Sequence, residues 1–82
     1  RWIESLTDQK GRGCCSTADG FPAEAEWDAT GGHYRVLINK QWHIVPDEAV
    51  VKGANKIGYA MVWWFYDGKV ITIRCFIAGT EV

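Results

Sequence analysis

Two apolar runs of strand length, residues 59–66 and 69–77, lie on either side of the dipeptide Asp67-Gly68. Aspartate followed by glycine between such runs is the strongest local signal for a two-residue β-hairpin turn, because both residue types accept the left-handed backbone that this turn needs. We therefore predict a long antiparallel hairpin near the C-terminal end of the chain. The other segments of this 82-residue chain must form their core around it.

Strand periodicity also marks the segment 22–28. Ala23, Ala25 and Trp27 alternate there with acidic residues, a pattern typical of a half-buried strand. Pro22 suits the start of an edge strand, because proline has no N–H to offer to a neighbour. A short helix is the alternative for this segment, and we favour the strand.

Two more strands are expected at residues 33–38 and 41–45, joined at Asn39-Lys40, where asparagine tolerates a positive φ. Residues 1–7 place Trp2, Ile3 and Leu6 at helical spacing and predict a short helix. Strand periods outnumber helical ones. The predicted fold class is mainly β, a small antiparallel curled sheet or partly open barrel with a short N-terminal helix, in one domain over residues 1–82.

A turn at Asp67-Gly68 would place Tyr66 opposite Lys69 and sort the side chains of the hairpin into two faces. One face is apolar and is the expected core, made of Ala60, Val62, Trp64, Ile71, Ile73 and Cys75. The other face carries Met61, Trp63, Phe65, Val70, Thr72, Arg74 and Phe76.

A solvated face is not expected to hold so many rings. Either the protein's own chain covers this second face, for example through Trp2 and Leu6, or the face is an exposed interaction platform. Arg74 would lie within reach of a cation–π contact with Trp63. The candidate binding residues are Trp63, Phe65, Arg74, Phe76 and Trp27, whereas Trp42 and Trp64 are expected to be buried.

Three cysteines, Cys14, Cys15 and Cys75, permit one disulfide and leave one thiol. Pairing between the adjacent Cys14 and Cys15 needs a strained ring, so a bridge from either of them to Cys75 is favoured. A redox-active pair and a thiol that links to a partner are the functional alternatives. The disulfide, together with a first residue, Arg1, that is not methionine, favours a mature periplasmic or secreted protein. No apolar run reaches the length of a membrane span.

Composition and motifs argue against several other classes. The net charge of −1 gives no electrostatic basis for binding nucleic acid. His33 and His43 are interpreted as strand residues rather than zinc ligands beside Cys14 or Cys15. The acidic residues of the segment 22–28 are interpreted as solvated edge charges rather than a glycosidase pair. We expect no catalytic site, metal or cofactor.

Several scattered residues resemble a known group. They are Gly13-Cys14-Cys15, Trp27, Trp42-His43-Ile44-Val45-Pro46 with Val50, and Ile73-Arg74-Cys75-Phe76. In these features the chain resembles small exported proteobacterial proteins to which no activity is assigned, and the resemblance implies export and a disulfide-tied β fold. Those proteins often have two further cysteines, at places where this chain has Gly20 and the Val62–Trp63 region. Separately, Trp-x-x-Val-Pro followed by valine resembles a segment of SH3-like barrels.

These observations predict an exported, non-enzymatic structural or interaction module that binds a protein partner or belongs to a larger assembly. The alternative is a cell-wall or glycan-binding domain that uses Trp63, Trp27 and Tyr59. A small enzyme or redox protein is the third and least favoured reading.

Overall fold

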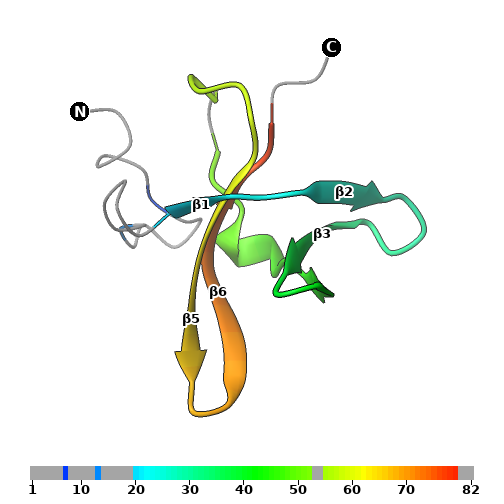
Figure 1. Cartoon of the computed structure of the whole chain (residues 1–82). Coiled ribbons are helices and arrows are strands. Elements are labelled where there is room, and N and C mark those ends of the chain that lie inside the picture. Colours follow the sequence, from blue (N-terminus) through cyan, green and yellow to red (C-terminus); the bar gives the residue numbers. More distant parts are fainter. Residues whose placement is uncertain (1–6, 8–12, 14–19, 53–54, 80–82) are drawn as a thin grey trace.

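Six short strands and one turn of 3-10 helix make up the fold in the computed structural model, which describes residues 7, 13, 20–52 and 55–79. The strands form two antiparallel three-stranded sheets, in the orders β1-β5-β6 and β2-β3-β4, that do not close into one barrel (Figure 1). The mainly β, antiparallel prediction is confirmed. The elements are β1 (Gly20–Pro22), β2 (Ala25–Asp28), β3 (His33–Ile38), β4 (Gln41–Ile44), η3 (Asp47–Ala49), β5 (Met61–Asp67) and β6 (Val70–Ile77).

The helix predicted for residues 1–7 falls outside the described residues, apart from Thr7. Thr7 itself forms an isolated antiparallel bridge with Gly13. Within the described part of the chain, no helix has the length and apolar character needed to cross a membrane.

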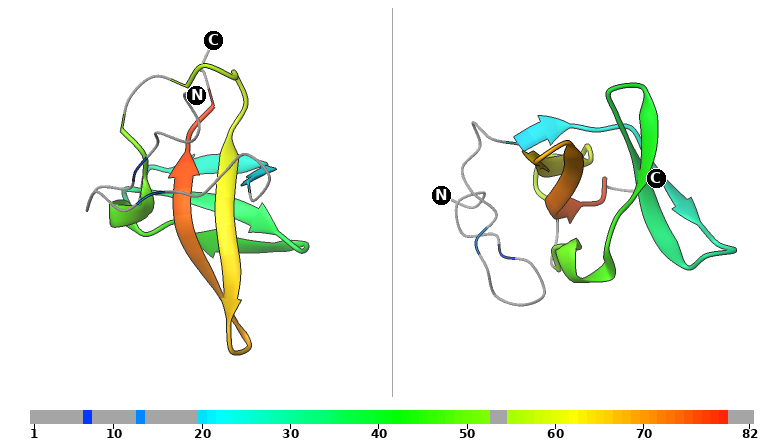
Figure 2. Two further views of the ribbon diagram at one scale, coloured as in Figure 1. Left: turned by 90° about the vertical axis from the view of Figure 1, so that its left-hand side faces the viewer. Right: turned by 90° about the horizontal axis from the view of Figure 1, so that it is seen from below.

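The segment that contains β1 and β2 passes from one sheet to the other. The Ala23 amide donates to the carbonyl of Ala60, just before β5, at 2.9 Å. The carbonyl of the next residue, Glu24, accepts from the amide of Leu37 in β3 at 2.9 Å. A strand that changes sheets in this way makes the corner of two crossed layers. The β5–β6 hairpin consequently runs across the strands of the second sheet (Figure 2). The prediction of a strand rather than a helix is confirmed for residues 25–28. The segment is not one strand, however: Pro22 ends β1, an edge strand among the described residues, instead of beginning the predicted strand.

The β3–β4 hairpin forms as predicted, with Asn39 and Lys40 at its turn. Both residues have positive φ, 52° at Asn39 and 68° at Lys40. Two successive left-handed residues define the turn that matches the twist of an antiparallel pair. Lysine tolerates this backbone less well than glycine does.

We expect Lys40→Gly to raise the free energy of unfolding by about 0.5–1 kcal/mol, because glycine removes the steric cost of the left-handed conformation. Lys69→Gly is the matched control, since Lys69 is a turn lysine whose φ is not positive. It should be neutral or destabilising by about 0.5 kcal/mol, because glycine there only adds freedom to the unfolded chain. Urea unfolding followed by tryptophan fluorescence measures both, and equal effects from the two variants would contradict the assignment.

The β5–β6 hairpin has a different register from the one predicted. Its turn residues are Gly68 and Lys69, with φ 66° at Gly68, so that Asp67 pairs with Val70. A turn that is left-handed only at its first central position requires glycine at that position, and Gly68 supplies it. The prediction of Asp67-Gly68 as the turn pair was therefore wrong by one residue.

A β-bulge between Trp63 and Trp64 changes which side chains share a face at the base of this hairpin. Beyond the bulge, Trp63 pairs with Cys75 and Val62 pairs with Phe76. Cys75 therefore lies on the opposite face from the one predicted, and Phe76 joins the face of Val62. Val62 and Ile73 do belong to one core cluster, with Trp64 and Ile71 packed against it, as expected.

Both faces of the hairpin base are buried. On one face Met61, Trp63, Cys75 and Ile77 pack with Val51, and Ile57 lies against them. On the other face the hairpin packs on the second sheet and on η3, through Val36, Ile38, Val45, Ala49, Val62, Ile73 and Phe76. Residues 50 and 51 bind the hairpin edge directly, since the Val51 amide donates to the Phe76 carbonyl at 2.7 Å.

Gly20 comes close to the first of these clusters. A Cβ atom at this position would lie 2.8 Å from Cε2 of Trp63, whose ring is only 1% exposed. At the Trp63 end, the second face of the hairpin is therefore covered by the protein's own chain. Trp2 and Leu6, which were expected to provide this cover, lie outside the described residues.

Candidate binding groove beside strand β2

The five candidate binding residues do not form one surface. Trp63 and Phe76 are 1% and 0% exposed, so the prediction that they belong to an exposed aromatic face is wrong. For Phe76 the bulge explains the error, because it turns this ring into the core against the second sheet. Trp63 keeps its predicted face and is buried because the chain around Gly20 and Val51 covers it. Trp27 and Phe65 are 56% and 47% exposed. Arg74 is half-buried, and its Nε donates to the Gly13 carbonyl at 2.8 Å.

Two of the five residues, Trp27 and Phe76, line an open groove of about 850 Å³ between β2 and the end of β6. The groove is open because small residues line it, Ala23 and Ala25 on the β2 side and Ala78 and Gly79 after β6. Tyr34 of β3 also lines it. We call it the tryptophan groove. Its lining residues are Ala23, Ala25, Glu26, Trp27, Tyr34, Ala60, Phe76, Ala78 and Gly79.

Three aromatic rings follow one another along the tryptophan groove. Trp27 meets Tyr34 edge to face with ring centroids 4.8 Å apart, and Tyr34 lies 5.2 Å from Phe76. The first ring is exposed and the last is fully buried, so the row leads from solvent into the core. Sequence reasoning identified Trp27 but missed Tyr34. The signal for Tyr34 was its alternation with Val36 and Ile38, which places it on the core side of β3.

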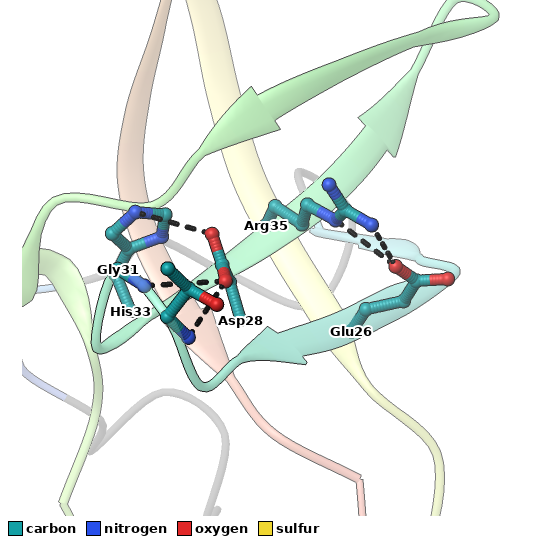
Figure 3. Close-up of polar contacts among 6 residues, drawn as sticks. Glu26, Asp28, Gly31, His33 and Arg35 are labelled. Atoms are coloured by element: carbon teal, nitrogen blue, oxygen red, sulfur yellow. Dashed lines mark hydrogen bonds and ion pairs between the residues drawn. The ribbon is translucent and has the colours of Figure 1, made fainter.

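The opposite face of β2 and β3 carries charged residues that fix the two strands together (Figure 3). Nε of Arg35 donates to Oε1 of Glu26 at 3.0 Å. This hydrogen bond, together with the negative charge of Glu26, raises the pKa of Arg35. The guanidinium carbon also lies 5.2 Å from the ring centroid of Trp42. Trp42 is 41% exposed on this outer face, so the prediction of a buried Trp42 is wrong.

Asp28 organises the turn that follows β2. Its Oδ1 accepts the amides of Thr30 at 3.0 Å and Gly31 at 3.2 Å, and its Oδ2 lies 3.7 Å from Nε2 of His33 (Figure 3). The pKa of Asp28 is held below its ordinary value mainly by the hydrogen bond from the Gly31 amide. Partial desolvation raises the pKa, but the Thr30 amide and the positive charges of His33 and Arg35 lower it further. Asp28 and Glu26 therefore have structural partners, whereas solvated edge charges were expected at these positions.

The lowered pKa of Asp28 predicts a loss of stability in acid. Because the folded pKa is below the unfolded value, the stabilisation is fully present above about pH 4 and is lost as the pH falls through the folded pKa. Asp28→Asn retains an oxygen acceptor for the two amides but carries no charge. Urea midpoints measured from pH 5 to pH 2 should fall more steeply for the wild type than for Asp28→Asn. Parallel curves would contradict this role of the carboxylate.

A second groove, of about 380 Å³, separates β4 and η3 from β6. It contains two other candidates, the exposed Phe65 and the half-buried Arg74. Its further lining residues are His43, Ile44, Pro46, Glu48, Ile71, Thr72 and Ile73. Among the described residues, no group of three or more histidine, cysteine or acidic side chains could hold a metal. Cys14 and Cys15, the other ligands considered for zinc, lie outside those residues.

No family model, no curated protein and no solved structure matches this chain. The resemblance to small exported proteobacterial proteins stays a prediction, and so does the likeness to SH3-like barrels.

Proposed function

We propose that this chain is a non-enzymatic interaction module that binds a segment of a protein partner in the tryptophan groove. The observation that carries the proposal is the position of Trp27. Its ring lies on the core side of the second sheet, against Tyr34, and is nevertheless 56% exposed. Tryptophan and tyrosine dominate the binding energy of protein interfaces, because a rigid ring buries a large area with little loss of entropy.

The tryptophan groove is a better binding site than the second groove for two reasons. It is the larger of the two, at about 850 Å³ against about 380 Å³. Its aromatic row is also anchored in the core through Phe76, so the exposed end is held in place before a partner arrives. A preorganised aromatic contact loses little free energy to ordering when it binds.

We also propose that the module is exported and is tied by a disulfide between Cys75 and either Cys14 or Cys15. Two observations support this. Arg74, next to Cys75, donates to the carbonyl of Gly13, the residue before Cys14. Cys75 itself makes a further interaction and is not free. A periplasmic or secreted location would permit such a bridge.

The proposed function predicts that Trp27→Ala strongly weakens peptide binding. Peptides are first enriched from a random display library on the immobilised wild-type protein, and their affinity is then measured by fluorescence anisotropy. We expect Trp27→Ala to weaken binding by at least about thirtyfold, the effect of losing an interface hot spot. Trp42→Ala is the matched control, since Trp42 is 41% exposed on the opposite face of the sheet, and it should leave binding unchanged. Failure to enrich any peptide, or equal binding by Trp27→Ala, would refute the proposal.

Binding of a cell-wall polymer or another glycan is the second candidate. Two of its three predicted residues, Trp27 and Tyr59, are exposed, Tyr59 to 50%, and exposed rings can stack on sugars. The third, Trp63, is buried and unavailable. A glycan array probed with the wild type and Trp27→Ala separates the candidates, because Trp27-dependent retention on glycans without peptide binding would favour the second.

A further inference from the structure

Resting on the proposed function, we infer that the partner segment adds to the free edge of β2 as an extended strand in which basic residues alternate with apolar ones. β2 lies at the edge of its sheet and, among the described residues, pairs with β3 alone. The tryptophan groove is lined by Ala25, Glu26 and Trp27 of this same strand. Strand addition to a sheet edge is a general mode of peptide recognition, in which the backbone gives affinity and alternate side chains give specificity.

The backbone of β2 has hydrogen-bonding groups directed toward the open edge. The Leu37 amide donates to the carbonyl of Glu24, so Glu24 and Leu37 form a hydrogen-bonded pair. Two residues further along, the register makes Glu26 and Arg35 a hydrogen-bonded pair as well. Hydrogen-bonded and non-bonded pairs alternate along an antiparallel ladder, so the N–H and C=O groups of Ala25 and Trp27 point away from β3. The carbonyl of Tyr34, which faces Trp27, agrees with this, since it accepts from Val45 instead.

The two faces of β2 differ in chemistry. Trp27 packs on Tyr34 at the groove side, together with Ala25 of the same face. Glu26 points to the other side, where its Oε1 bonds Arg35 and its Oε2 can still accept. Glu24 shares the face of Glu26 and is exposed. A strand added beside β2 would therefore meet an aromatic surface and an acidic surface at alternate positions.

Charge complementarity selects the occupant. Opposite charges placed across two strands stabilise their pairing, whereas like charges directly opposite each other destabilise it. A second copy of β2 would bring Glu24 and Glu26 against carboxylates of the same kind, which disfavours self-pairing. Lysine or arginine at alternate positions of the partner would instead lie beside these two carboxylates, and the apolar residues between them would contact Trp27.

Four capped seven-residue peptides test the inference by fluorescence anisotropy. The first alternates lysine and valine, the second has the same composition in two blocks, and the third and fourth replace lysine by glutamine and by glutamate. We expect the alternating lysine peptide to bind most tightly, and the block and glutamate peptides to bind at least about tenfold more weakly. Added salt should weaken the binding of the lysine peptide, because these charges are exposed.

Glu24→Gln should weaken binding of the alternating lysine peptide by roughly two- to fivefold, the effect of one cross-strand charge pair. Asp67→Asn is the matched control, because it removes the same charge from the exposed tip of the β5–β6 hairpin, far from β2 (Figure 1). It should leave the affinity unchanged.

Equal binding of the block peptide would overturn strand addition, and equal binding of the glutamine peptide would overturn charge selection. If none of the four peptides binds while library-selected peptides still bind through Trp27, the inference is wrong and the proposed function stands. If the library-selected peptides also fail, both are wrong.

Discussion

Replacing Phe76 with alanine is expected to lower the free energy of unfolding by about 3–5 kcal/mol. The Phe76 side chain is 0% exposed and packs where the β5–β6 hairpin crosses the second sheet. Its removal takes away apolar contact area and leaves a cavity that the surrounding backbone cannot fill, because Val62 and Val51 hold the strand on either side. A domain of 82 residues has little stability in reserve, so much of the Phe76→Ala population should be unfolded at 37 °C.

Phe65→Ala provides the matched control, because it deletes the same side chain from the same hairpin at a position that is 47% exposed. We expect a loss of less than about 1 kcal/mol for this variant. Urea unfolding followed by far-ultraviolet circular dichroism compares both with the wild type. Similar losses for the two variants would show that the hairpin does not pack on the second sheet through Phe76.

Reduction of the proposed disulfide is expected to cost about 4 kcal/mol, which on the chain-entropy model corresponds to opening a loop of roughly 60 residues. The bridge would tie the segment before β1 to the end of β6. Cys75 lies there at 0% exposure, beside the Arg74–Gly13 hydrogen bond. The urea midpoint should therefore fall sharply when a reductant is added.

Alkylation of the unfolded, unreduced protein counts the thiols independently. Intact mass should show one label without reductant and three labels after reduction, since the chain has three cysteines. Cys75→Ala should unfold at the same denaturant concentration with and without reductant if Cys75 is part of the bridge. Three labels in the unreduced protein, or a wild-type midpoint that reductant does not move, would remove the basis for the disulfide and weaken the case for export.

Local turn chemistry made the strands predictable from the sequence. The expected strands at residues 33–38 and 41–45 agree with β3 and β4 to within one residue, because Asn39-Lys40 fixes the turn between them. The alternation around Trp27 likewise identified β2 as a strand with an exposed tryptophan. In both cases the deciding interactions are between residues close together in the chain.

The errors have non-local causes. Nothing in the sequence shows that the pairing of β5 with β6 shifts between Trp63 and Trp64, where Arg74 of β6 is left without a partner in the ladder. This shift decides which faces Cys75 and Phe76 are buried on. The sequence of β4 identifies it as a strand but does not show which of its two faces packs against the β5–β6 hairpin. Trp42 was therefore assigned to the core, although it lies on the outer face. The tryptophan groove could not be predicted, because its walls come from β2 and the end of β6, which lie far apart in the sequence.

Residue-resolved hydrogen exchange, followed by NMR with and without the alternating lysine peptide, tests most directly whether β2 is the binding edge. Without peptide, the amides of Ala25 and Trp27 should exchange faster than that of Glu26, which already faces β3. Bound peptide should slow exchange at Ala25 and Trp27 and leave Glu26 nearly unchanged. Slowed exchange confined to other strands, with Ala25 and Trp27 unaffected at saturating peptide, would contradict the account.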